Sequence, residues 1–168
     1  ADMIVLIYEA PSEQITQLKA ESQFKDIKYV SGDFTDEAVL KRSGIQTASR
    51  ALIVADHSAK YSQLEIDSRT VLAVLTMTNL NPNLYVAAEL LDSKFEKHLQ
   101  MAHCDEIILT TEYEHSLIAS ASSGLGFSNV FRELIGNNND SGIIIKDIPA
   151  SFVGKTYAEY RSLCRVDA

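Results

Sequence analysis

Short apolar runs alternate along this chain with segments whose apolar residues recur at helical spacing, and this alternation limits the possible folds more than any other feature. Runs of strand length stand at 3–8, 27–30, 50–55, 84–88 and 106–109. Helical patterns stand between them, and a further helical stretch covers 112–135, broken near 124–126. Continuous apolar runs are typical of strands covered on both faces. The alternation therefore predicts βαβ units and an α/β fold with a Rossmann-like, doubly wound, mostly parallel sheet.

Cap residues predict where several helices begin and end. Thr35 precedes an acidic turn and is the expected N-cap of the second helix, which Gly44 ends. In the long helix expected at 64–80, the residues predicted to face the core are Val71, Leu72, Val74 and Leu75.

One segment has the composition of a linker. Residues 136–142 read GNNNDSG and interrupt the alternation of strands and helices. We expect a first domain at 1–136, a linker at 137–142 and the start of a second lobe at 143–168, which opens with a strand at 142–147. This last part is too short to bury a core of its own.

Charge and cysteine content exclude several classes of protein. The net charge is −8, which argues against a nucleic-acid partner because phosphate binding needs a basic face. Cys104 and Cys164 are the only cysteines, too few for a disulfide framework, and they fit a reducing cytoplasm. No apolar run reaches the ~18 residues of a membrane-spanning helix; if the protein works at a membrane, another part of the chain or a partner supplies the anchor.

Acidic residues follow most of the predicted strands. Ligands of open α/β sheets bind at the carboxyl ends of the strands. Carboxylates stand there as Glu9, Asp33, Asp56, Glu89 and Glu112. Each one taken singly is explained as a helix cap. Together they predict a ligand site on one rim of the sheet.

Catalytic patterns are absent from the sequence. The four histidines, at 57, 98, 103 and 115, have no metal-ligand spacing, and no nucleophile elbow, P-loop or zinc-protease motif occurs. Gly124-Leu125-Gly126 follows a helix, not a strand, so we interpret it as a helix break. We do not expect an enzyme.

Several segments together resemble the RCK (regulator of potassium conductance) or TrkA-N family. The most specific is VSGDFTDEAVLKRSGI at 30–45, which is similar to the family's strand–Gly-Asp–helix segment. The remaining segments follow in the family's order and spacing: RALIVAD at 50–56, VAAEL at 86–90, LQMAHCDEIIL at 99–109, SNVFRELI at 128–135 and DIPASFVGKTYAEY at 147–160.

The resemblance implies ligand residues. The implied cofactor is NAD(H) or an adenine nucleotide. Its ribose would contact Glu9, and its adenine would lie in a pocket formed by Gly32, Asp33 and Phe34. The middle of the cofactor would face Ala55 and Asp56 at the end of the next strand, and Glu89 would form the floor of the site. For Ca²⁺ it implies Asp33, with Glu65 and Asp67 as further candidates.

The resemblance also implies partners. The last part of the helical stretch resembles the helix that crosses to an identical subunit, in a homodimer that can assemble into a larger gating ring. Its apolar residues are Phe127, Val130, Phe131 and Leu134; the alternative is that they pack on the chain's own sheet. The further partner is a potassium-channel pore or the membrane subunit of a transporter.

One departure from the family concerns the sheet itself. The family's first strand and Gly-rich turn, which hold a pyrophosphate, would precede Ala1, so we expect them to be missing from this chain.

The resemblance also implies a function and a location. The function is that of a gating domain of a potassium channel, at the cytoplasmic face of the cell membrane, that senses a nucleotide, Ca²⁺ or both. Two alternatives are a soluble NAD-binding regulatory subunit of a Trk-type potassium uptake transporter and a fragment of an NAD-dependent dehydrogenase.

Overall fold

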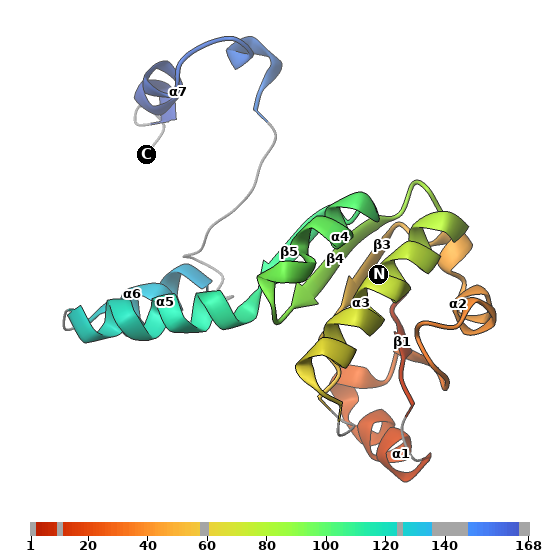
Figure 1. The fold of residues 1–168 in the computed structure, drawn as a ribbon. Helices are drawn as coiled ribbons and strands as arrows, with labels where there is room; N and C mark the ends of the chain where they lie inside the picture. The colour runs from red at the N-terminus through yellow and green to blue at the C-terminus, as the bar shows by residue number, and fades with distance from the viewer. Residues whose placement is uncertain (1–2, 10–11, 58–60, 124–125, 136–147, 165–168) are drawn as a thin grey trace. The chain divides into compact units, whose positions relative to one another are not determined.

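The computed structural model describes residues 3–9, 12–57, 61–123, 126–135 and 148–164 (Figure 1). Its elements follow the predicted alternation. The expected linker at 137–142 and the expected strand at 142–147 both lie outside the described residues. In chain order the elements are β1 (Val5–Ile7), α1 (Ser12–Ala20), η1 (Ser22–Phe24), β2 (Lys28–Val30), α2 (Glu37–Ser43), η2 (Ile45–Thr47), β3 (Arg50–Ile53), α3 (Gln63–Leu80), β4 (Tyr85–Leu90), η3 (Ser93–Phe95), α4 (Glu96–Met101), β5 (Glu106–Leu109), α5 (Thr110–Ser123), α6 (Phe127–Ile135), η4 (Ala150–Phe152) and α7 (Tyr157–Cys164).

The chain divides into two compact units. The first is Ala1–Ser116 and holds every described strand together with helices α1 to α4. The second is Leu117–Ala168 and holds α6 and α7. Within the described residues, no helix is both long and apolar enough to cross a membrane.

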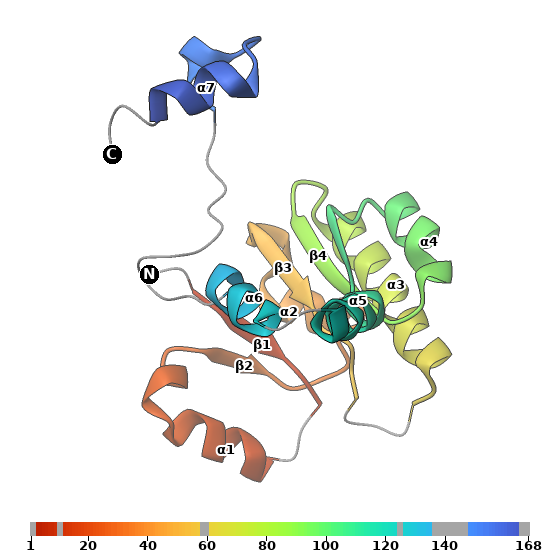
Figure 2. The ribbon, with the colours of Figure 1, turned by 90° about the vertical axis from the view of Figure 1, so that its left-hand side faces the viewer.

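The strands of the first unit form two separate parallel sheets. One contains β1 and β2, with Leu6 opposite Tyr29. The other has the order β3-β4-β5, with Ala51 opposite Val86 and Glu89 opposite Ile108. Figure 2 shows the two sheets with α1 beside the smaller one. The predicted parallel α/β architecture is confirmed, and its sheet is in two parts.

The core lies where α3 and α4 pack on the larger sheet (Figure 1). Leu90 and Leu99 are completely buried there, together with Val74 of α3. The expected burial of Leu72 and Leu75 is wrong: these side chains are 51% and 41% exposed. The reason is geometric, since α3 covers the sheet with one face only and these two residues lie off that face.

Helix α2 begins one residue later than expected. Its N-cap is Asp36, whose carboxylate accepts hydrogen bonds from the N–H groups of Ala38 and Val39 at 2.6 and 3.4 Å. Thr35 instead donates to Asp33 from both its N–H and its hydroxyl. Gly44 ends the helix with φ 87°, as predicted, because a left-handed residue at this position favours glycine.

Candidate ligand site at the carboxyl rim

The turn after β2 is built around Gly32 and Asp33. Gly32 has φ 151°, and a Cβ added to it would lie 2.7 Å from a methyl group of Val39, so only glycine fits there. Asp33 accepts hydrogen bonds from the N–H and hydroxyl of Thr35, at 2.9 and 2.8 Å. These contacts fix the carboxylate at the carboxyl end of β2, facing α3.

Arg69 of α3 meets this carboxylate. Its two terminal nitrogens donate to the two oxygens of Asp33 at 3.1 and 3.2 Å. The guanidinium carbon lies 5.0 Å from the ring centres of both Phe34 and Tyr61, within the range of cation–π attraction. The pair joins the turn after β2 to the larger sheet's helix α3 and to the residue that precedes that helix's N-cap.

The surroundings of Asp33 favour its ionised form. Partial burial works against ionisation, but the hydrogen bonds from Thr35 and the bond and charge of Arg69 outweigh it and lower the pKa of Asp33. The carboxylate therefore stays charged at pH values below the ordinary pKa of an aspartate.

Glu89 links the ends of the larger sheet. One of its carboxylate oxygens accepts the N–H of Ala55, which follows β3, at 2.8 Å. The other accepts the hydroxyl of Thr110, which follows β5, at 2.9 Å. Because Glu89 is itself part of β4, these two hydrogen bonds hold the ends of β3, β4 and β5 together.

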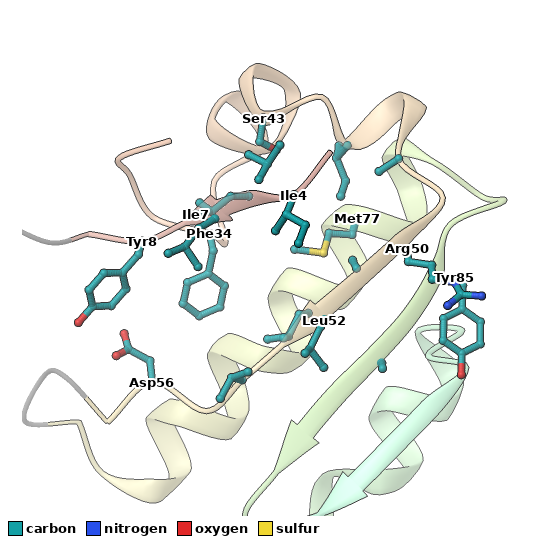
Figure 3. Close-up of a pocket in the computed structure, with 18 of the residues that line it drawn as sticks. Ile4, Ile7, Tyr8, Phe34, Ser43, Arg50, Leu52, Asp56, Met77 and Tyr85 are labelled. Carbon is teal, nitrogen blue, oxygen red and sulfur yellow. The ribbon is translucent and has the colours of Figure 1, made fainter. Parts of the chain in front are cut away.

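A cavity of about 1150 Å³ lies between β1 and β3. Near its carboxyl end it is bordered by Tyr8, Phe34 and Asp56 (Figure 3). The structure thus brings three of the predicted nucleotide contacts, Phe34, Ala55 and Asp56, around one cavity. Of the other four, Glu9 is exposed after β1, Gly32 shapes its turn, and Asp33 and Glu89 are held in their own hydrogen-bonded groups.

The two weaker cation candidates hold backbone groups. Glu65 forms a capping box with Ser62 at the start of α3, and the hydrogen bonds from Ser62 lower its pKa. Asp67 is completely buried, and its oxygens accept the N–H groups of Leu91 and Asp92 at 3.0 and 2.9 Å. Burial raises the pKa of Asp67, an effect that these bonds only partly offset. Among the described residues, no group of three or more His, Cys, Asp or Glu side chains is placed to hold a metal ion.

Sequence reasoning missed Arg69, Tyr61 and Tyr8. A signal for Arg69 was present, because it is the only basic residue in the 18 residues of α3 and stands next to the buried Thr70. A lone cation on the buried side of a helix needs a carboxylate partner. The two tyrosines have no comparable signal in the sequence.

Helix α6 carries the predicted interface residues. Phe127 and Phe131 stack with ring centres 6.2 Å apart, one turn from each other, and Val130 beside them is 58% exposed. The side chain of Leu134 lies outside what the structure describes.

Parallel strands that alternate with helices, with polar groups collected at the carboxyl ends, define a Rossmann-like α/β class of domain. Residues 1–88 match the model of one family within this class, the calcium-activated potassium channel slowpoke-like RCK domain. This match covers more than half of the chain, and the chain belongs to that family. The resemblance to RCK domains drawn from the sequence is confirmed.

Two relatives are potassium channel proteins by name. The calcium-gated potassium channel TvoK of Thermoplasma volcanium is 28% identical over 120 residues, which are 70% of this chain and 34% of TvoK. The putative potassium channel protein YugO of Bacillus subtilis is 30% identical over 89 residues, which are 53% of this chain and 26% of YugO. The chain therefore spans about a third or less of the length of these relatives.

Two solved structures share the fold. The human SLO3 gating ring matches with a TM-score of 0.62 at 18% identity, over 86% of this chain and 26% of that one. The TrkA-N domain of the inner membrane protein ybaL from Escherichia coli matches with a TM-score of 0.55 at 10% identity, over 69% and 76%. At these identities the likeness shows the fold alone.

Proposed function

We propose that this chain is the regulatory domain of a potassium channel, on the cytoplasmic side of the membrane, and that a ligand at the carboxyl rim changes how identical subunits pair. Membership of the slowpoke-like RCK family and the two channel relatives support this role. The subunits pair through α6, whose exposed Val130 lies beside the stacked Phe127 and Phe131. A ligand shifts this pairing only if its affinity differs between the two arrangements.

The observation that carries the proposal is the ion pair between Asp33 and Arg69. Both side chains are partly exposed, at 36% and 21%, so a ligand can reach them. The pair connects the turn after β2 to α3, which packs on the other sheet. A ligand that binds the Asp33 carboxylate in place of Arg69 removes this connection. Binding at the rim then changes how the smaller sheet is attached to the larger one.

Ca²⁺ is the ligand we propose first. The matching family is described as calcium-activated, and TvoK is named as calcium-gated. Ca²⁺ is bound by oxygens, mostly of carboxylates, and competes with an arginine for them. Asp33 is the proposed ligand, and Glu65 and Asp67 are weaker candidates, because each already holds backbone N–H groups.

A nucleotide is the second candidate. Phe34, Ala55 and Asp56 border the cavity near the carboxyl ends of the strands, which is where doubly wound sheets bind nucleotides. In this reading the ribose hydroxyls take the place of Arg69 on Asp33. We propose a regulatory and not a catalytic role, since the matching family is a potassium channel RCK domain and both relatives are named as potassium channel proteins.

Titration calorimetry with CaCl₂, and separately with NAD⁺ and ADP, tests the site. Because Arg69 competes for Asp33, Arg69→Gln is expected to tighten binding of Ca²⁺ or of the nucleotide about tenfold, the equivalent of ~1.4 kcal/mol. Asp33→Asn is expected to weaken it at least as much. Glu37→Gln, at an exposed carboxylate paired with Lys41, is the matched control and leaves binding unchanged. Equal affinities in all three variants contradict the site.

A further inference from the structure

A second cavity, of about 540 Å³, lies beside the smaller sheet. It is lined by residues of β1 and β2 and by residues at the carboxyl ends of α1 and α2. Four basic side chains border it, and we call it the basic pocket: Lys19, Lys25, Lys28 and Arg42. We propose that the basic pocket binds a ligand that carries two or more phosphate groups.

The charge of the basic pocket is opposite to that of the chain as a whole. The chain has 15 Lys and Arg residues against 23 Asp and Glu residues, and its net charge is −8. Four of the 15 basic residues line this one cavity, and no described Asp or Glu does. The lining is therefore not a sample of the average surface, and it favours an anionic ligand of more than one charge.

The lysines of the basic pocket have no carboxylate partners. Elsewhere in the described chain, Lys41 and Lys94 each pair with a carboxylate close to them in the sequence. Lys19, Lys25 and Lys28 are exposed and form no ion pair with a described carboxylate. Each ammonium group has three donors, so a ligand in the basic pocket meets donors that the protein itself does not use.

The fourth cation is held in place by the backbone. One terminal nitrogen of Arg42 donates to the C=O of Ser31 at 2.6 Å. A guanidinium has five N–H donors in a planar fork that matches the geometry of a phosphate, and this bond uses one of them. Because the side chain is already fixed, less conformational entropy is lost when a ligand binds it.

The electrostatics of helix ends explain only part of this cluster. Lys19 and Arg42 lie in the last turns of α1 and α2, where basic residues stabilise the carboxyl end of a helix. Lys25 follows η1, a helix of only three residues, and Lys28 is the first residue of β2. The last two cations therefore have no such role, and the tests below use them.

The size and the apolar lining of the basic pocket indicate more than a single phosphate ion. A volume of about 540 Å³ lies within the ~300–1,000 Å³ of small-molecule sites. Met3, Val5 and Ile27 complete the lining, and Val5 pairs with Lys28, so these two side chains lie on the same face of the sheet. A ligand with phosphates at the cations and carbon atoms at these apolar residues fits this arrangement.

Two sources supply this chemistry. One is a soluble polyphosphate, and the other is a lipid headgroup with two phosphates at a membrane surface. The basic pocket is separate from the carboxyl rim, because none of the residues proposed to bind a ligand there lines it. The inference therefore goes beyond the proposed function and holds whichever ligand the rim binds.

Titration calorimetry with sodium tripolyphosphate, in the absence of divalent cations, tests the soluble source. Replacing two cations in Lys25→Gln/Lys28→Gln is expected to weaken binding at least about tenfold, because charge-assisted hydrogen bonds are lost. Lys94→Gln/Lys97→Gln removes the same charge beside the larger sheet and is the matched control, expected to bind as the parent chain does. All four side chains are exposed, so neither change is expected to shift the unfolding midpoint.

Vesicle sedimentation tests the membrane source. Phosphatidylcholine vesicles that contain cardiolipin, which has two phosphates, are compared with vesicles in which phosphatidylglycerol, which has one, supplies the same total charge. Binding is expected to be at least about tenfold tighter to cardiolipin and to be lost in Lys25→Gln/Lys28→Gln but not in the control.

The two probes together decide the proposal. Tripolyphosphate binding without vesicle binding assigns a soluble ligand, and cardiolipin-dependent sedimentation assigns a lipid headgroup. Tripolyphosphate has no base or ribose, so its binding is separate from that of the nucleotide proposed at the rim. The proposal is overturned if neither probe binds the parent chain, or if Lys25→Gln/Lys28→Gln and Lys94→Gln/Lys97→Gln change binding to the same extent.

Discussion

The two sheets of the first unit differ in how far they bury their own side chains. In the larger sheet, Val86, Ala88 and Leu90 of β4 are completely buried under α3 and α4. In the smaller sheet, no described side chain from Met3 to Val30 is buried. Parallel sheets are typically covered on both faces. The larger sheet supplies most of this cover itself, whereas the smaller one depends on neighbours.

The largest expected effect contrasts one leucine from the buried surface with one from the open edge. Leu90→Ala leaves a cavity among fully buried neighbours and is expected to lower the free energy of unfolding by about 2–5 kcal/mol. Leu52→Ala, at a 67% exposed side chain, is expected to change it by less than about 0.5 kcal/mol. Urea unfolding of the 168-residue chain measures both. Similar losses for the two variants would mean that the edge is already covered.

An intermediate effect is expected at the turn after β2. Gly32→Ala combines a positive φ with a Cβ that meets Val39, and we expect it to cost about 2–3 kcal/mol. Gly44→Ala also has a positive φ, but nothing lies within 4 Å of the added Cβ, so about 1 kcal/mol is expected. Thermal unfolding of both variants gives the comparison. If Gly32→Ala costs no more than Gly44→Ala, the close approach of α2 to this turn is not needed for stability.

The sequence predicted the elements of the larger sheet better than their packing. Apolar runs located each strand, because β-branched and aliphatic residues concentrate there whatever their partners are. The exposure of Leu72 was not predicted, since the helical pattern of α3 is apolar around most of its circumference and does not show which side meets the sheet.

The candidate site shows the same limit. Strand ends can be read from the sequence, and Phe34, Ala55 and Asp56 do meet at one cavity. The partners of the acids cannot be read from it, because Asp33 and Arg69 are 36 residues apart and meet only through the packing of α3 beside the turn after β2. The parallel sheet was predicted, but its division into two parts was visible only in the pairing of the strands.

The smallest expected effect is on the pH dependence of stability, and its sign differs between an acid beside the smaller sheet and an acid beside the larger one. The pKa of Asp33 is lowered below its ordinary 3.8, so its contribution to stability is present above pH 3.8 and is lost as pH falls through the lowered value. The pKa of Asp67 is raised, so its contribution is present below pH 3.8 and is lost as pH rises through the raised value. One acid belongs to the turn of the smaller sheet and the other to the helix of the larger one.

In the Asp33→Asn variant, the free energy of unfolding is therefore expected to fall less as the pH is lowered. In the Asp67→Asn variant, it is expected to fall less as the pH is raised above 3.8. The Asp33 effect is expected to be at most about 1 kcal/mol, because the carboxylate is 36% exposed and water screens its pair with Arg69. Unfolding free energies between pH 2.5 and 6 are compared as slopes, since Asp67→Asn also leaves a buried N–H without its acceptor. Arg69→Gln should reproduce only part of the Asp33→Asn change in slope, because the bonds from Thr35 remain. If Arg69→Gln reproduces all of it, the link between the two sheets is the whole source of the shift at Asp33, and the turn contributes nothing on its own.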